Sequence, residues 1–296
     1  MSDITLLDGG IGQEVVRRAG DRPTPLWSTR AMMDHPGLVA QVHRAYFDAG
    51  ATIATANTYA ILRDRLVKEG IADRFEALQS AALDEAQQAA RGRGRVAGAI
   101  GPLVATYRPE THPPPDIAVP QYAEVARLLA PRVDLILCET VASLTHGRAI
   151  LDGARAAEKP VWIAFTLDDE DGTRLRSGEA VDQAAQIAVE GGAEAVLANC
   201  SAPEAMGVAI DIFARTGLPC GAYANGFTQI TKDFLKDSPT ADALTSRRDM
   251  GPEAYADFAM DWLDRGATIL GGCCETTPAH IAEIARRLRA AGHRIV

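Results

Sequence analysis

The stretch VDLILCET, residues 133–140, is apolar at nearly every position and ends in an acidic residue and a threonine. A strand that is covered on both faces shows such an unbroken apolar run, whereas a strand with one wet face alternates apolar and polar residues. The stretch therefore predicts a central strand of a parallel sheet with helices on both sides.

Seven further runs of this kind recur along the chain, and helical patterns separate them. The eight expected strands are ITLLDGG (4–10), ATIATANTY (51–59), VAGAIGP (96–102), VDLILCET (133–140), PVWIAFTL (160–167), AEAVLANCS (193–201), PCGAYANG (219–226) and ATILGGCC (267–274). One intervening helix is expected over residues 34–50, with Asp34 as its N-cap, Pro36 in its first turn and Gly50 at its end.

Eight strands alternating with helices favour an α/β fold of one kind, a single (β/α)8 TIM barrel over residues 1–296. A doubly wound open sheet is the alternative. The first strand is not followed by the Gly-x-Gly-x-x-Gly turn that often opens such a sheet, which favours the barrel. The proline-rich segment 107–120 fits a loop on the side of the active site, although its role is not evident from the sequence.

Composition excludes several classes of protein. The 296 residues are 47% hydrophobic, and they carry a formal net charge of -9 with no basic block, so nucleic acid is not an expected partner. No run approaches the roughly 18 apolar residues of a membrane span, and the first residues do not form a signal peptide. We therefore expect a cytoplasmic protein that contacts no membrane. No apolar stripe on the expected helices indicates an oligomeric state.

In a barrel of this type the chemistry lies at the C-terminal ends of the strands. Three of the five cysteines fall there: Cys200 ends the sixth strand, and Cys273 and Cys274 end the eighth. Because cytoplasmic thiols stay reduced, such a cluster indicates metal binding or catalysis rather than a disulfide. Three thiolates with one open position match a catalytic Zn²⁺ site, in which a substrate takes the fourth place.

The local sequence around the adjacent pair favours ionised thiols. Thr277 and Pro278 fit the N-cap and first position of a helix, whose N-terminus stabilises negative charge. Gly271 and Gly272 allow a sharp turn that would aim both sulfurs at one ion. A strained vicinal disulfide, inert packing of the thiols and phosphate binding by the glycines remain alternatives.

Other cysteines and histidines are expected to pack rather than to bind a metal. Cys220 lies at a strand start, and Cys138 should point away from Glu139 because neighbours in a strand face opposite sides. His43 and His146 fall on expected helices, where surface or packing positions are the usual interpretation.

With these residues in place, the chain resembles the homocysteine S-methyltransferase family over essentially its whole length. The stretches that carry the resemblance are LLDGGIGQE, PLWSTRAMMDHPGLVAQVHRAYFDAGATIATANTY, LILCET, FTLDDEDGTRLRSGE, LANCSAPE and GATILGGCCETTPAHI. The resemblance implies that Cys200, Cys273 and Cys274 bind Zn²⁺. It also implies that Asp8 and Glu139 are the catalytic carboxylates, which hold the ammonium group of homocysteine.

The resemblance further implies the reaction. A methyl group would pass from a small sulfonium donor, S-methylmethionine or S-adenosylmethionine, to the zinc-bound homocysteine thiolate, forming methionine. Trp27 stands where the family has an aromatic residue near the donor, and a cation-π contact would suit that place. The other expected substrate-binding residues are Asn57, Thr58, Tyr59 and Asn225.

Several alternatives remain open at this stage. Betaine-using members carry further tyrosines at the places of Ala60 and Thr140, which disfavours a betaine donor. A stand-alone homocysteine module served by a separate corrinoid protein, as in a split cobalamin-dependent methionine synthase, is the alternative within the class. A zinc- or thiol-binding regulatory barrel without catalysis and a redox dithiol enzyme belong to other classes.

Overall fold

The computed structural model describes residues 2–20, 24–228, 230, 235 and 244–296. Its strands are β1 (Asp3–Leu6), β2 (Ile53–Thr55), β3 (Arg95–Ile100), β4 (Leu135–Val141), β5 (Val161–Phe165), β6 (Ala195–Asn199), β7 (Cys220–Tyr223), β8 (Ile269–Leu270) and β9 (Arg294–Ile295). They are hydrogen-bonded in the order β2-β3-β4-β5-β6-β7-β8-β1-β9, and all the pairs are parallel.

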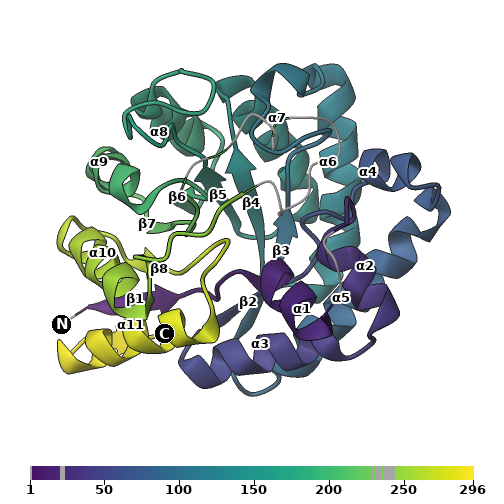
Figure 1. The fold of residues 1–296 in the computed structure, drawn as a ribbon. Coiled ribbons are helices and arrows are strands. Elements are labelled where there is room, and N and C mark those ends of the chain that lie inside the picture. Colours follow the sequence, from purple (N-terminus) through teal and green to yellow (C-terminus); the bar gives the residue numbers. More distant parts are fainter. Residues whose placement is uncertain (1, 21–23, 229, 231–234, 236–243) are drawn as a thin grey trace.

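Helices connect the strands and surround the sheet (Figure 1). They are α1 (Ile11–Ala19), α2 (Ser28–Asp34), α3 (Leu38–Ala49), α4 (Arg63–Lys68), α5 (Phe75–Ala90), α6 (Pro115–Leu129), α7 (Leu144–Ala154), α8 (Val181–Glu190), α9 (Pro203–Phe213), α10 (Pro252–Asp264) and α11 (Pro278–Ala290). The (β/α)8 barrel that the sequence predicts is confirmed. Each expected strand forms within or close to its predicted range but is shorter. In every predicted strand except β4, the last residues turn into the loops that carry the candidate site.

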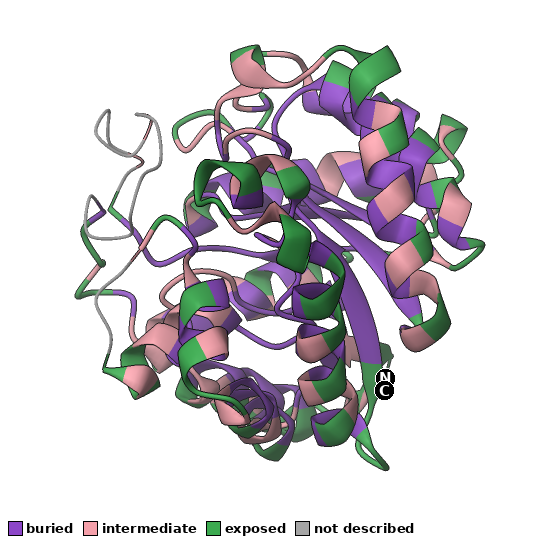
Figure 2. Ribbon diagram, turned by 90° about the vertical axis from the view of Figure 1, so that its right-hand side faces the viewer, coloured by how far each residue is buried: buried purple, intermediate pink, exposed green. Residues whose placement is uncertain are grey.

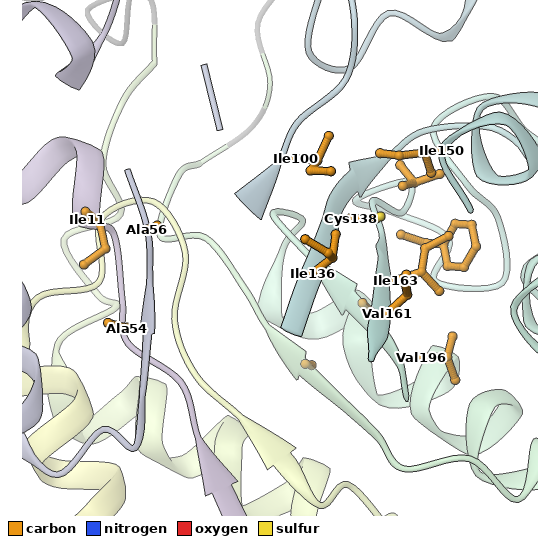
Figure 3. Close-up of a cluster of buried hydrophobic side chains, with 14 of the residues drawn as sticks. Ile11, Ala54, Ala56, Ile100, Ile136, Cys138, Ile150, Val161, Ile163 and Val196 are labelled. Carbon is orange, nitrogen blue, oxygen red and sulfur yellow. The ribbon is translucent and has the colours of Figure 1, made fainter. Parts of the chain in front are cut away.

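Successive side chains along each strand alternate between two buried environments, the interior of the barrel and the layer between sheet and helices. Leu135 and Leu137 of β4 pack with Trp162 and Leu197 inside the barrel. Their neighbour Cys138 instead packs in the layer between sheet and helices, where Figure 3 shows it near Ile136 and Ile163. The predicted packing role of Cys138, facing away from Glu139, is therefore confirmed. Figure 2 shows the same arrangement, with buried strands inside and helices that expose one face.

The barrel closes at one seam, between β1 and β2, through single backbone and side-chain hydrogen bonds. One edge of β1 pairs with β8. On the other edge its first residues, Asp3 and Ile4, pair with β9, a short C-terminal strand that the sequence did not predict. Toward β2, Thr52 donates its N–H to the Leu6 carbonyl at 2.7 Å. The Asp8 carboxylate then accepts the Thr55 N–H at 2.6 Å. Asp8 thus joins the two strands at the end of the barrel that carries the candidate site.

The helix expected over residues 34–50 is wrong at its start. Asp34 is the last residue of α2, and α3 begins only after Gly37, whose φ of 90° lies in the left-handed region. His35 precedes Pro36, and a residue before proline avoids the helical conformation, so the chain breaks there. The predicted end is confirmed, because Gly50 terminates α3 with a φ of 113°.

Two further features complete the fold. Within the described part of the chain, none of the helices combines the length and the apolarity needed to cross a lipid bilayer. The two chain ends lie together, as Figure 2 shows, because β9 pairs with β1. This places the ends away from the loops that follow the barrel strands.

Close packing of β7 on β8 makes one glycine sensitive to substitution. A Cβ added at Gly221 would lie 1.7 Å from the Ile269 carbonyl oxygen, so Gly221→Ala should force the two strands apart. We expect a loss of about 3 kcal/mol in the free energy of unfolding, measured by urea denaturation. The control is Gly251→Ala, where nothing lies within 4 Å. Because Gly251 is the N-cap of α10, the loss in the free energy of unfolding should be about 1 kcal/mol or less. Equal stability of the two variants would contradict the packing argument.

Candidate metal and substrate site

The three predicted cysteines lie together. The Cys200 Sγ atom is 2.8 Å from Cys273 Sγ and 3.8 Å from Cys274 Sγ, and the adjacent pair are 4.0 Å apart. Cys200 is buried, and the other two are partly exposed. A vicinal disulfide would need sulfurs about 2.05 Å apart, so the pair at 4.0 Å are free thiols.

The cluster fits a tetrahedral metal ion. A Zn–S bond of about 2.3 Å sets the sulfurs of such a site about 3.8 Å apart. The Cys200–Cys274 and Cys273–Cys274 separations match this value, while Cys200 and Cys273 would have to move apart by about 1 Å. All three ligand atoms lie within 4.8 Å of one another. Thiolate sulfur is a preferred donor for zinc, so the chemistry of the donor set fits as well.

An unusual backbone aims these sulfurs at one another. Cys200 has a φ of 53°, in the left-handed region that non-glycine residues rarely adopt. Gly271 and Gly272 have no left-handed φ, so the turn expected from them is not the reason for their presence. A Cβ on Gly272 would lie 2.1 Å from Thr276 Oγ1, and one on Gly271 would lie 2.6 Å from Leu7 Cβ. The glycines therefore permit close packing of the loop.

Hydrogen bonds to α10 also fix the loop after β8. Tyr255 of α10 accepts the Ala224 N–H at 2.9 Å and donates to the Gly271 carbonyl at 2.9 Å, which links the ends of β7 and β8. The predicted start of the closing helix is confirmed, since Thr277 is the N-cap of α11 and Pro278 its first residue. The N-cap Thr277 also forms a capping box with His280.

The cluster favours one thiolate among three sulfurs. Hydrogen bonds from Cys273 and Cys274 hold the pKa of the Cys200 thiol well below its usual range. The same interactions raise the pKa of both partners well above theirs. A bound cation would displace the thiol protons of the cluster, as expected for a thiolate metal site.

Two carboxylates are buried in the same cavity. Asp8 is 3% exposed and Glu139 is 8% exposed. Burial raises the pKa of Asp8 to about 7. Burial, together with the negative charges of Cys200 and Asp8, raises the pKa of Glu139 to about 8. The Tyr223 hydroxyl donates to Glu139 at 3.3 Å. Both groups would regain their charge beside a cationic ligand.

One cavity collects most of the predicted site residues. Its empty volume is about 880 Å³, and the predicted residues that line it are Asp8, Trp27, Asn57, Tyr59, Glu139, Cys200, Cys273 and Cys274. Thr58 and Asn225 do not line it. Thr58 donates its hydroxyl to the Ala99 carbonyl at 2.7 Å, and Asn225 accepts the Phe227 N–H at 3.1 Å. His43 and His146 are buried outside the cysteine cluster, and His43 Nδ1 lies 3.9 Å from the Asp8 carboxylate.

Other lining residues were not among the predicted site residues. Tyr223, Thr106 and Tyr107 line the cavity. Tyr223 lies two positions before Asn225, so strand alternation would place both side chains on the inner face of the barrel. Because β7 ends at Tyr223, only the Tyr223 side chain faces the cavity. Thr106 and Tyr107 belong to the loop after β3, a connection whose path is not set by apolar periodicity.

Strained backbone conformations gather around this cavity. Among the described residues, the non-glycine positions with positive φ include Trp27, Tyr107, Thr140 and Cys200, and all four line it. Such conformations cluster at functional sites because the surrounding structure must hold them. The backbone thus indicates independently of the cysteines that this end of the barrel is the functional one.

Comparisons with known proteins agree with this fold. A family model described as homocysteine S-methyltransferase matches residues 5–288. The homocysteine S-methyltransferase of Escherichia coli (strain K12) is 28% identical, with 96% of this chain and 95% of that protein covered. Homocysteine S-methyltransferase YbgG of Bacillus subtilis (strain 168) is 27% identical, with 95% and 93% covered. The structure of the homocysteine methyltransferase MmuM from Escherichia coli, in its metallated form, matches with a TM-score of 0.81 at 25% identity, covering 97% of this chain and 96% of that chain.

The buried carboxylates predict a specific dependence of stability on pH. The ordinary pKa of an aspartate is 3.8, and Asp8 is raised to about 7, so between these values the folded protein holds a proton that the unfolded chain has released. The free energy of unfolding should therefore fall as pH rises through this window. Asp8→Asn, measured by urea denaturation of metal-free protein from pH 5 to 8, should flatten the fall below pH 7. An unchanged slope would contradict the raised pKa.

Proposed function

The chain belongs to the homocysteine S-methyltransferase family, and from that premise we propose that it methylates homocysteine to methionine with a small sulfonium donor and Zn²⁺ as cofactor. The observation that carries the proposal is the gathering of three cysteine sulfurs within 4.8 Å in a cavity that also contains two buried carboxylates. Residues 1–296 would act as one homocysteine-binding barrel domain.

The metal site would consist of Cys200, Cys273 and Cys274, which leave a fourth position for the acceptor sulfur. Zn²⁺, when bound there, supplies a Lewis acid that keeps a thiol ligand deprotonated at neutral pH. The three cysteines fix the position of that sulfur. The surrounding apolar residues limit the access of water, which would otherwise solvate the nucleophile and slow its attack.

Asp8 and Glu139 would bind the ammonium group of homocysteine. Both carboxylates line the cavity, and no Lys or Arg is found among the described residues that line it, so a cationic ligand would compensate their charge when they are ionised. The negative charge of Cys200 contributes to the raised pKa of Glu139, which means that the carboxylate and the sulfur cluster are close enough to interact. A short amino acid that carries both an ammonium and a thiol would reach the carboxylates with one group and the sulfur cluster with the other.

Aromatic side chains favour a cationic methyl donor. Trp27, Tyr59 and Tyr223 line the cavity, and aromatic faces attract a sulfonium or ammonium methyl group. The homocysteine thiolate would attack the donor methyl carbon in line, forming one S–C bond while the donor S–C bond breaks. The electron pair returns to the donor sulfur, which leaves as a neutral thioether. No proton transfer and no covalent enzyme intermediate are required.

Replacing one metal ligand tests the cofactor. Cys200→Ser should reduce bound zinc from about one per chain to under about 0.2, as measured by elemental analysis of chelator-treated and reloaded protein, with loss of methyl transfer. Cys220→Ser is the matched control, because Cys220 is buried at the start of β7, away from the cluster. If both variants keep their zinc, the three-cysteine site is not the metal site.

Donor turnover tests the reaction. Purified zinc-loaded protein should form methionine from homocysteine and S-methylmethionine or S-adenosylmethionine without any added corrinoid protein. Trp27→Leu should then raise the KM for the donor by about 3- to 30-fold, the range of a cation-π contact, with little effect on the KM for homocysteine. Methionine formation only with methylcobalamin, or only with betaine, would contradict a sulfonium donor.

Absence of turnover with every donor has a separate meaning. Zinc and homocysteine binding without methyl transfer would favour a regulatory barrel instead. Isothermal titration of the zinc-loaded protein with homocysteine separates this outcome from a protein that binds neither ligand.

A further inference from the structure

Tyr107, in the loop between β3 and α6, contacts the cysteine cluster directly. Its hydroxyl donates a hydrogen bond to Cys200 Sγ at 2.9 Å. We propose that Tyr107 is a positioning residue for the metal centre, whose hydrogen bond orients the Cys200 sulfur and reduces the negative charge that this sulfur donates to the metal. The inference rests on the proposed function, because it requires a metal on the three cysteines.

The surrounding residues fix the position of the Tyr107 side chain. The side chain is 6% exposed and packs in a small cluster with Cys200, Phe227 and Leu244. Its backbone has a φ of 62°, which a bulky residue rarely adopts. Such a conformation persists only where surrounding contacts hold it, and the hydrogen bond to the Cys200 sulfur is one of them.

A charged pair supports both partners of this hydrogen bond. The guanidinium of Arg176 lies 5.2 Å from the centre of the Tyr107 ring. Asp169 holds Arg176 through two hydrogen bonds of 2.7 and 2.8 Å. Asp169 also accepts the Ala202 N–H at 2.8 Å, two residues after Cys200. The pair therefore links the tyrosine ring to the backbone that carries the cysteine.

The chemical consequence follows from the charge of the sulfur. A hydrogen bond to a thiolate withdraws electron density from it and fixes the direction of its lone pairs. Groups that orient metal ligands in this way typically change metal affinity by about 10- to 100-fold when they are removed. The Arg176 guanidinium makes the Tyr107 hydroxyl a stronger donor, because it stabilises the partial negative charge on the phenolic oxygen.

The test uses Tyr107→Phe, which keeps the ring and removes the hydroxyl. With Co²⁺ in place of zinc, the thiolate-to-cobalt charge-transfer band should move to longer wavelength, because the sulfur electrons are no longer stabilised by the hydrogen bond. Chelator competition should show zinc affinity reduced by about 10-fold. Neither readout depends on methyl transfer.

Tyr122→Phe is the matched control. Tyr122 is buried beside the same loop, where its hydroxyl accepts the Leu103 N–H at 3.2 Å and pairs with His112 at 3.1 Å, without contacting the sulfurs. Its removal perturbs the loop but should leave the cobalt band in place. Arg176→Met should shift the band in the same direction as Tyr107→Phe but less, and it carries the test if Tyr107→Phe does not fold.

Two outcomes would overturn different statements. An unchanged cobalt band in Tyr107→Phe, or an equal shift in Tyr122→Phe, would overturn the role of the hydrogen bond, whatever happens to zinc affinity. Failure of the unmodified protein to bind Co²⁺ or Zn²⁺ would instead overturn the metal centre and the proposed function on which it rests.

Discussion

Three thiols and two carboxylates face one cavity in which no described lining residue is basic, and this concentration of acidic groups is the constraint on which the site depends. In the protein alone, protons relieve it. Burial raises the pKa of Asp8 and of Glu139, so both carboxyl groups hold their protons more tightly, and hydrogen bonds from the other two thiols lower the pKa of Cys200, which loses its proton first. Cations relieve it better, since a divalent metal and an ammonium group compensate the charge without neutralising the ligands.

The fold stabilises this arrangement because the acidic groups also form hydrogen bonds to neighbouring strands and side chains. The Asp8 carboxylate accepts the Thr55 N–H and so helps to close the seam between β1 and β2. Glu139 is hydrogen-bonded by Tyr223, and the loop of the adjacent cysteines is fixed through Tyr255. The groups that need a ligand are thus held in place before the ligand arrives, which lowers the cost of ordering them on binding.

The sequence was sufficient for the barrel and for the cysteine cluster, but not for the loops. Apolar runs mark buried strands, and strand order then brings Cys200 and the Cys273–Cys274 pair to one end. Three failures have physical causes. Pro36 separates two helices that share one amphipathic pattern, and β9 is too short to leave a periodic signal. Asn225 turns away because β7 ends before it, a boundary that side-chain alternation cannot locate. Thr58 lies in the turn after β2, between Asn57 and Tyr59, which do line the cavity.

In the proposed reaction the same charge balance acts on the donor. A sulfonium entering a cavity of excess negative charge is attracted by the field as well as by the aromatic faces of Trp27 and Tyr59. Methyl transfer converts that cation into a neutral thioether and the acceptor thiolate into another. Both attractions disappear in one step, so the products are held less strongly than the substrates were. A site built from acidic groups thereby favours binding of a cationic donor and release of what remains of it.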